Sequence, residues 1–306
     1  MILVTGATGR IGRHLVPALL KKGEKVRVLV RDQDKARGLW GGSVQIIHGD
    51  IMDRSAVFEA MKGIDVVYHL AAQVSNAPRK EMFRINLEGT RNILEAGHGK
   101  RLVYLSSSSV YGKIYGKGSR STITEKTPFV PTDVYGESKA AADKLARELG
   151  AVVLRPTLVY GPGCDEGFLK LFGMVKRMKA VIAGSGKNRL QWTHVDDLVS
   201  ALVLAKDKGR PGEAYDIVSD DARTQEELLG VIARVQGVKP PKLHVPLWLL
   251  RTVGRLFVKS SAVDTIAADR IFDCTKAKRE LGWQPKVRYE EGIGGALKHK
   301  AECEGH

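Results

Sequence analysis

Short apolar runs alternate with longer stretches of helical period through the first half of the chain. The short runs predict strands that are buried on both faces of a parallel sheet. They lie near residues 1–5, 26–30, 44–47, 66–69, 102–105 and 152–154. Helices are predicted where apolar residues recur every three or four positions, at 13–22, 56–61, 82–96 and 134–149. This alternation predicts an α/β fold with a doubly wound parallel sheet, whose ligands bind at the carboxyl ends of the strands.

The regular alternation of strand and helix patterns ends after Pro156. Glycine-containing breaks at 161–163 and 184–186 interrupt it, and residues 191–195 have the pattern of a strand. Further helices are predicted at 168–179, 199–205, 225–235 and 289–299. We therefore expect residues 1–160 to form mainly the sheet domain. Residues 161–306 are expected to form mainly a smaller C-terminal lobe, with some segments returning to the main sheet.

A glycine-spaced turn follows the first predicted strand and precedes the first predicted helix. Its glycines are Gly6, Gly9 and Gly12, in the spacing Gly-x-x-Gly-x-x-Gly. Such a turn lets backbone amides approach a pyrophosphate, and the helix N-terminus supplies partial positive charge for it. The commoner dinucleotide fingerprint is Gly-x-Gly-x-x-Gly, so the spacing found here distinguishes this turn from the common one. The alternative is a tight corner with a structural role alone.

Tyr135 and Lys139 stand four residues apart on a predicted helix. Side chains at this spacing share one face, so the lysine ammonium can favour the tyrosine anion. An ordinary tyrosine has a pKa of about 10, and a nearby positive charge brings it toward the working range of an acid or base. The pair therefore predicts a proton-transfer site. The alternative is an exposed helical pair that contributes a few tenths of a kcal/mol at most.

Composition indicates an ordinary globular protein. Of 306 residues, 43% are hydrophobic and 27% charged. The three cysteines, Cys164, Cys274 and Cys303, are odd in number and lack metal-ligand spacing, so we expect free thiols in a reducing compartment and no metal. The N-terminus has no charged segment followed by an apolar one, and a cytoplasmic protein is therefore expected.

His194, Asp196 and Asp197 are close in sequence but lack the spacing of a metal site. We expect Asp197 to act as a helix cap.

The chain carries a formal charge of +15, which suits nucleic acid, an anionic membrane surface or phosphate-bearing ligands. Its lysines and arginines are spread along the sequence and are not interleaved with aromatics, so we expect a solvated basic surface and no nucleic-acid partner. The segment 245–258 is unusually apolar but too short to cross a bilayer. It is expected to cover an apolar substrate, or else to contact a membrane surface or a second subunit.

These motifs together resemble the extended branch of the short-chain dehydrogenase/reductase superfamily, the NAD-dependent epimerase/dehydratase family. The resemblance runs over nearly the whole chain. Its further motifs are Asp50–Asp53, His69–Ala72, Asn86–Thr90, Ser106–Gly112, Arg155–Pro162, His194–Asp197 and Leu281–Pro285. It implies an enzyme with a Rossmann sheet and a smaller C-terminal substrate-binding lobe. Dimers built on the helices at 82–96 and 134–149 are common in the family, so a homodimer is also expected.

The resemblance implies an NAD(P) site around the glycine turn. Asp50 and Ile51 are expected to border the adenine, Ala71 and Ala72 the ribose, and Pro156 the nicotinamide, while Asn86 is expected to stabilise the backbone and water of the site. The turn itself is expected to contribute Gly6, Thr8, Gly9, Arg10, Ile11 and Gly12.

The resemblance favours NADP over NAD. NAD-preferring relatives carry an acidic residue at the end of the second strand, where this chain has Val30, and Arg31 follows. A guanidinium suits a 2′-phosphate through charge-assisted hydrogen bonds, and Lys35 and Arg10 add charge to the same corner. The alternative is that Arg31 stacks on the adenine while Asp32 binds the ribose, which would keep NAD as the cofactor.

By similarity, Tyr135 is the proton donor or acceptor at a carbonyl or alcohol oxygen. Lys139 is expected to hold the nicotinamide ribose and to lower the pKa of the tyrosine. Ser107 is expected to orient the reacting oxygen, with Ser106 or Ser108 as the alternative because successive strand residues point to opposite faces. The expected reaction is hydride transfer between the nicotinamide and a small substrate.

Three functions remain open, and the first is favoured. The segment 184–190, the Val30/Arg31 pair and the segment 245–258 are similar to 3β-hydroxysteroid dehydrogenases and dihydroflavonol-type reductases, which act on apolar ketones and alcohols. The second is a nucleotide-sugar epimerase or dehydratase. The third is a non-catalytic NADPH-binding structural or sensor protein, which the presence of serine, tyrosine and lysine together disfavours.

The epimerase alternative has residues for and against it. Ile123-Thr124-Glu125, with two prolines after it, looks like the epimerases. Against it, Thr157 replaces their usual asparagine, and Leu190-Gln191-Trp192 replaces an Arg-Asp-Phe-like triplet that binds the diphosphate. Arg189 and Arg155 remain as candidates for that contact.

Overall fold

Seven strands pair in one parallel sheet, in the order β11-β6-β5-β4-β1-β2-β3. The computed structural model describes residues 1–74, 77–112, 122–163, 166–250, 252 and 269–304. The strands are β1 (Ile2–Thr5), β2 (Val26–Val30), β3 (Gln45–His48), β4 (Val66–His69), β5 (Arg101–Leu105), β6 (Val152–Pro156) and β11 (Ala214–Ile217). The predicted doubly wound sheet is therefore confirmed. The strand order reverses between β1 and β4, the place where ligands bind in such sheets.

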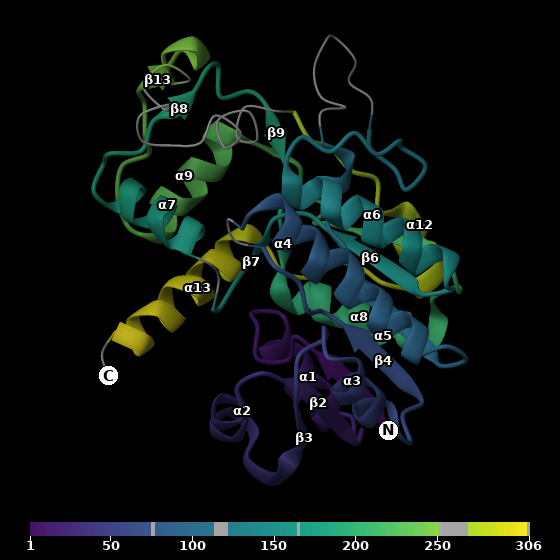
Figure 1. Cartoon of the computed structure of the whole chain (residues 1–306). Coiled ribbons are helices and arrows are strands. Elements are labelled where there is room, and N and C mark those ends of the chain that lie inside the picture. Colours follow the sequence, from purple (N-terminus) through teal and green to yellow (C-terminus); the bar gives the residue numbers. More distant parts are fainter. Residues whose placement is uncertain (75–76, 113–121, 164–165, 251, 253–268, 305–306) are drawn as a thin grey trace.

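Helices cover both faces of this sheet (Figure 1). On one face the apolar core joins α1 (Gly12–Lys21), α2 (Gln33–Trp40), α8 (Val195–Lys208) and α12 (Thr275–Leu281). On the other it joins α3 (Arg54–Met61), α5 (Thr90–Ala96) and α6 (Val134–Glu148). Successive strand residues alternate between the two cores, since Ile2 and Val4 belong to the first and Leu3 to the second. The sequence pattern did not predict α2, β11 or α12.

A smaller lobe has its own aromatic core. Tyr160, Phe168, Trp192 and Tyr289 contact one another with ring centroids 5.0–6.1 Å apart. The helices of the lobe are α7 (Glu166–Lys176), α9 (Gln225–Val235) and α13 (Tyr289–Glu304). Its short strands are β7 (Val159–Tyr160), β8 (Ile182–Ala183), β9 (Arg189–Leu190), β10 (Thr193–His194), β12 (Arg223–Thr224) and β13 (His244–Val245). The single strand predicted at 191–195 is thus replaced by β9 and β10, which pair in different sheets.

Helix α6 is tied to the sheet by a buried ion pair. Arg155 on β6 donates from Nε and Nη2 to the two carboxylate oxygens of Asp143, at 2.9 and 2.7 Å. Both side chains are fully buried. Removing one partner from such a pair is strongly destabilising, because the remaining charge is left unpaired in a medium of low dielectric constant. The pair therefore holds α6, which carries Tyr135 and Lys139, at a set height above β6.

Asp197 does not cap a helix, and that prediction is wrong. The N-cap of α8 is His194, whose Nδ1 accepts a hydrogen bond from the backbone N–H of Asp196. The Asp197 carboxylate instead accepts hydrogen bonds from the backbone N–H groups of Lys286 and Val287. It therefore fastens the C-terminal segment to α8 across about ninety residues of sequence.

Parts of two predictions lie outside the described residues. Of the segment 245–258, the structure describes β13, a helical turn at 247–250 and residue 252. Among all described residues, no helix combines the length and apolar character needed to cross a membrane. Cys274 is a buried free thiol, and burial raises its pKa to about 12, whereas the side chains of Cys164 and Cys303 are not described.

Candidate active site

The glycine turn between β1 and α1 leaves no room for side chains. A Cβ atom at Gly6 would lie 2.6 Å from the backbone nitrogen of Ala71, and one at Gly12 would lie 2.3 Å from the carbonyl oxygen of Ala7. Gly6 also has a φ of +69°, which favours glycine. The close approach joins the end of β1 to the end of β4 and exposes the first turn of α1 at the strand ends.

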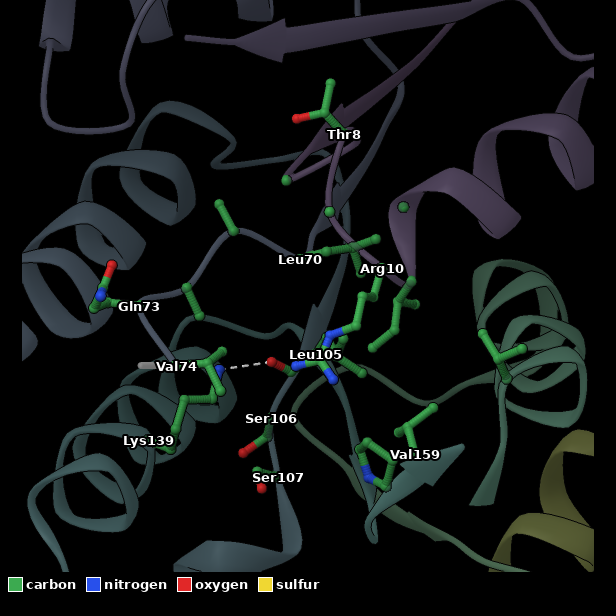
Figure 2. Close-up of a pocket in the computed structure, with 18 of the residues that line it drawn as sticks. Thr8, Arg10, Leu70, Gln73, Val74, Leu105, Ser106, Ser107, Lys139 and Val159 are labelled. Atoms are coloured by element: carbon green, nitrogen blue, oxygen red, sulfur yellow. Dashed lines mark hydrogen bonds between the residues drawn. The ribbon is translucent and has the colours of Figure 1, made fainter. Parts of the chain in front are cut away.

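A cavity of about 640 Å³ opens at this turn and follows the carboxyl ends of the strands. Every sequence-predicted site residue except Asn86 lies in its wall. These residues are Gly6, Thr8, Gly9, Arg10, Ile11, Gly12, Arg31, Lys35, Asp50, Ile51, Ala71, Ala72, Ser107, Tyr135, Lys139 and Pro156. Figure 2 shows side chains from the turn, from the end of β5 and from α6 facing the same space. The volume is in the range of small-molecule and cofactor sites.

Asn86 lies one layer behind the wall and is buried to 1% exposure. Its amide oxygen accepts a hydrogen bond from the backbone N–H of Gln73, and its Nδ2 donates to the Gln73 carbonyl and to the Ser138 hydroxyl. Asn86 sits in a π-helical segment, η2 (Arg84–Gly89), between α4 (Arg79–Phe83) and α5. Such π-turns are frequent at functional sites. Asn86 therefore does not line the cavity itself, but holds the backbone of the wall residue Gln73 and the Ser138 hydroxyl on the helix of Tyr135.

Tyr135 and Ser107 both line the cavity. Burial raises the pKa of Tyr135, while the side chain of Ser107 and the positive charge of Arg10 lower it in part. Ser107 begins η3 (Ser108–Tyr111), where its oxygen accepts from the backbone N–H of Ser109. Ser106 and Ser108 line the cavity as well, and Ser107 is the one of the three whose side chain acts on the pKa of Tyr135.

Arg10 was assigned to the adenosine corner from the sequence, and the structure corrects this. Its side chain extends into the cavity toward the end of β5 (Figure 2), and its charge acts on the phenol of Tyr135. The sequence offered no signal for this reach, because it depends on the direction in which α1 leaves the turn.

The predicted effect of Lys139 on Tyr135 is not seen. Burial lowers the pKa of Lys139 to about 7, so its amine is uncharged at the higher pH where a phenol ionises. The amine is 2% exposed and donates to the Tyr104 hydroxyl at 2.6 Å and to the Leu105 carbonyl at 2.7 Å. Burial thus outweighs the pairwise attraction expected from the helical spacing.

Tyr104 belongs to a buried polar cluster that the sequence reasoning missed. Its ring stacks on His69 at a centroid distance of 5.6 Å. His69 bridges the hydroxyls of Thr5 and Thr90, at 2.7 and 2.9 Å, and burial lowers its pKa to about 3. Since Thr90 donates its proton to the Asn86 carbonyl, His69 donates from Nε2 and accepts at Nδ1. The cluster links β1, β4, β5 and α6 behind the cavity wall.

The far end of the cavity is polar and basic. Arg31 is 77% exposed and lies 3.8 Å from the Asp50 carboxylate, and Lys35 lines the same end. Asp32 is engaged elsewhere, because its side chain caps α2 by accepting from the backbone N–H of Lys35. With the glycine turn in the middle, these groups fit a dinucleotide whose adenosine end is at β2 and whose other end is at Tyr135.

Beyond Tyr135 the wall is largely apolar. It includes Val74 and Leu158, which are 54% and 53% exposed, with Val159 and Tyr160. Arg270 also lines the described cavity, and no sequence motif had predicted it.

Neither arginine proposed for a diphosphate contact lines the cavity. Arg155 is fully buried against Asp143, and Arg189 lies 3.6 Å from the Asp269 carboxylate. Arg155 is therefore no longer a candidate for that contact, since its Nε and Nη2 donate to Asp143 and its Nη1 donates to the Tyr111 hydroxyl.

Comparison with known proteins gives a consistent match. Residues 2–218 match the profile of the NAD dependent epimerase/dehydratase family. A UDP-glucose 4-epimerase from Vibrio cholerae is 33% identical over 95% of this chain and 93% of that protein. The sterol demethylase protein B of Methylococcus capsulatus is 30% identical over 92% of this chain and 93% of its own length.

A solved structure extends the match to three dimensions. A dTDP-glucose 4,6-dehydratase from Streptomyces venezuelae, determined as a double mutant with NAD bound, superposes with a TM-score of 0.81. The two chains are 26% identical over 100% of this one and 98% of the other.

The buried Lys139 makes a prediction about stability and pH. Its pKa is about 7 in the folded chain, against 10.5 when exposed, so between these values the unfolded state binds more protons and the fold gains stability as pH rises. Lys139→Met removes this gain. We expect the free energy of unfolding of the original chain to rise relative to the variant from pH 7 to pH 9, by up to roughly 1.4 kcal/mol per pH unit.

Urea unfolding at several pH values measures this difference. Lys144→Met, an exposed lysine on the same helix, is the control and should show no relative slope. Parallel curves for Lys139→Met and the original chain would contradict the depressed pKa.

Proposed function

Because this chain belongs to the NAD-dependent epimerase/dehydratase family of extended short-chain dehydrogenases/reductases, we propose that it moves a hydride between a nicotinamide and a small substrate. The reacting group of the substrate is a carbonyl or a secondary alcohol, and the rest of the substrate is apolar. One observation carries the proposal: a single cavity is walled by the glycine turn at one side and by Tyr135 with Ser107 at the other.

Each part of the wall has a task in this proposal. The amides of the glycine turn and the first turn of α1 bind the pyrophosphate, and Arg31 and Lys35 bind the adenosine end. The dinucleotide, when bound, supplies or accepts the hydride. Ser107 orients the substrate oxygen, and Tyr135 gives it a proton or takes one from it.

The raised pKa of Tyr135 bears on how the rate of each direction depends on pH. A phenol that keeps its proton at neutral pH is ready as an acid, which carbonyl reduction requires. Alcohol oxidation requires the phenolate, so that direction should accelerate as pH rises. Lys139 is proposed to hold the end of β5, and with it the serine segment, through its bonds to Tyr104 and Leu105.

Removing the phenolic oxygen tests the proposal. Tyr135→Phe should lower turnover of an apolar ketone by about 10²–10⁴-fold, since the proton then has no positioned donor. Tyr215→Phe, which removes the same atom on β11, should leave turnover unchanged. Steady-state kinetics and titration with NADPH measure both effects. Full turnover by Tyr135→Phe with intact cofactor binding would overturn the mechanism.

We infer NADP as the preferred nicotinamide. Two observations support it: the end of β2 presents Arg31 without an acidic residue, and Asp32 is engaged in capping α2. Asp50 shares the charge of Arg31, but exposed ion pairs of this kind are weak and a phosphate dianion competes well with one carboxylate.

Substituting Arg31 decides between the two cofactors. Arg31→Ala should weaken NADPH binding by roughly tenfold or more, the loss of one or two charge-assisted hydrogen bonds, and leave NADH binding nearly unchanged. Arg91→Ala, an exposed arginine on α5, is the matched control. Dissociation constants from fluorescence titration give the answer. Equal affinities for the two cofactors before and after the change would reject NADP preference.

We propose an apolar substrate because the wall beyond Tyr135 is lined by exposed apolar side chains. Val74 and Leu158 are each more than half exposed, so an apolar ligand would remove much apolar surface from water at these two side chains. The segment Leu190-Gln191-Trp192, which corresponds to the diphosphate-binding triplet of sugar-nucleotide enzymes, has structural contacts in this chain. Gln191 bonds to Ser219 and Phe272, and Trp192 packs in the aromatic core.

One observation favours the second candidate, a nucleotide-sugar epimerase. Arg270 lines the cavity and can bind a diphosphate in place of the missing triplet. The UDP-glucose 4-epimerase of Vibrio cholerae also has the higher identity of the two relatives described above.

Calorimetry with sugar nucleotides separates the two functions. With the chain saturated with NADP, we expect UDP-glucose and dTDP-glucose to bind no more tightly than millimolar, because Arg270 is the one cation of the described cavity wall that is assigned neither to the cofactor nor to Tyr135 and its supports. Micromolar binding that Arg270→Ala abolishes would establish the epimerase reading instead.

A further inference from the structure

Acidic residues are missing from two segments of the smaller lobe. Residues 167–195 and 228–252 contain six and four Lys or Arg residues respectively, and neither contains Asp or Glu, although the chain holds 34 acidic residues in all. The basic residues of the chain are spread along its sequence, as expected, but the acidic ones are not. Each segment therefore carries charge of one sign along its sequence. In the fold Arg189 pairs with Asp269 and Arg234 with Glu290, and the exposed cations described below are other residues of the two segments.

The fold brings the two segments together. Strands β8 and β13 pair in parallel, and Ile182 and Gly184 donate backbone hydrogen bonds to the carbonyls of Leu243 and Val245, each at 2.8 Å. Figure 1 shows β8 and β13 side by side at one end of the smaller lobe, distant from α1 and α3. Helix α7 joins the same end through Gln236, whose amide donates to the Phe172 carbonyl.

Exposed cations without ion pairs populate this part of the lobe. Within the described residues, none of the following exposed side chains has an ion-pair partner: Lys176, Arg177, Lys179, Lys187, Lys239 and Lys242. The name "basic end" is used for these six residues together with the five exposed apolar residues described in the next paragraph. The acidic residue that borders it is Glu226, whose backbone N–H donates to Gly186.

Large apolar side chains are exposed among these cations. Of eleven exposed large apolar residues in the described chain, five belong to the basic end: Met174, Met178, Leu243, Trp248 and Leu249. Trp248 is 67% exposed, whereas the other three tryptophans are at most 9% exposed. Met178 is 68% exposed and is held outward at the end of α7, by a turn with a φ of +55°.

We propose that the basic end docks on an anionic lipid surface. Trp, Leu and Met side chains enter the headgroup region, where an amphipathic indole is favoured, and the lysines and arginines face the anionic headgroups. Exposed aliphatic side chains gain nothing from a phosphate backbone, which is why lipid fits better than nucleic acid. The proposal stands apart from the catalytic assignment, since none of these residues lines the cavity.

Trp248 makes the proposal directly measurable. The whole chain is mixed with vesicles of phosphatidylcholine alone, or of phosphatidylcholine with about 30% phosphatidylserine, a strongly anionic surface. We expect a blue shift of tryptophan emission and co-sedimentation with the anionic vesicles only. Trp248→Phe should abolish the shift but keep the co-sedimentation. Raising salt from about 0.1 M to about 0.5 M should weaken binding at least several-fold, because the charges are screened.

A charge-reversal pair tests the location. Arg177→Glu with Lys179→Glu should weaken binding to anionic vesicles about tenfold or more, given the contribution of each basic residue near such a surface. Lys21→Glu with Lys22→Glu, on exposed α1 positions, changes the net charge equally and should leave binding unchanged. Lys239→Glu with Lys242→Glu gives a second test at the basic end. NADPH titration confirms that each variant is folded.

Three results would overturn the proposal. The first is no co-sedimentation with anionic vesicles. The second is an equal loss of binding in the α1 control pair, which would show a general effect of net charge. The third is a Trp248 shift with duplex DNA and none with vesicles, which would make nucleic acid the partner.

Discussion

The close backbone contact at the glycine turn is the constraint on which the rest of the structure depends. Gly6 lies against the backbone at Ala71, and Gly12 against Ala7, with no space for a Cβ at either position. This contact brings the ends of β1 and β4 together at the point where the strand order reverses. The N-terminus of α1 then faces the strand ends, and Arg10 enters the cavity beside Tyr135.

Burial, more than pairwise attraction, sets the electrostatics behind the cavity wall. Lys139, Tyr104 and His69 lie in one polar cluster that hydrogen bonds satisfy but solvent does not reach. Desolvation disfavours the charged form of each group, so the pKa falls for the lysine and the histidine and rises for the tyrosine. Near pH 7 the histidine and the tyrosine of this cluster are therefore neutral, and the lysine is partly protonated.

Several polar residues near the junction of the sheet and the smaller lobe hold elements together. Arg155 joins β6 to α6, and Gln191 and Asp197 bind backbone N–H groups that are far away in sequence. The cavity wall beyond Tyr135 includes the exposed apolar side chains of Val74 and Leu158, whereas its cofactor end is basic. At the basic end, by contrast, the six cations named above have no ion-pair partner among the described residues. The smaller lobe thus joins an aromatic core to a basic outer surface.

Much of the fold and half of the site chemistry were readable from the sequence. Strand and helix periods, the glycine spacing and the Tyr135/Lys139 pair are local features, because each depends on residues within one turn or one strand. They determined the doubly wound sheet, the place of the glycine turn and the residues that line the cavity. The elements α2, β11 and α12 escaped prediction because polar residues interrupt their apolar pattern. A buried aspartate, Asp216, stands within β11, and α2 and α12 each bury only two side chains among charged ones.

Tertiary structure decided what those residues touch. The partner of Lys139 lies 35 residues away on β5, the carboxylate of Asp197 binds amides about ninety residues away, and Asn86 acts through Gln73. Burial and side-chain direction follow from how distant segments pack, and no local pattern encodes them. For that reason the chain alone determined where its chemistry is concentrated, and only the packed fold decided which groups are charged and which charges are already paired.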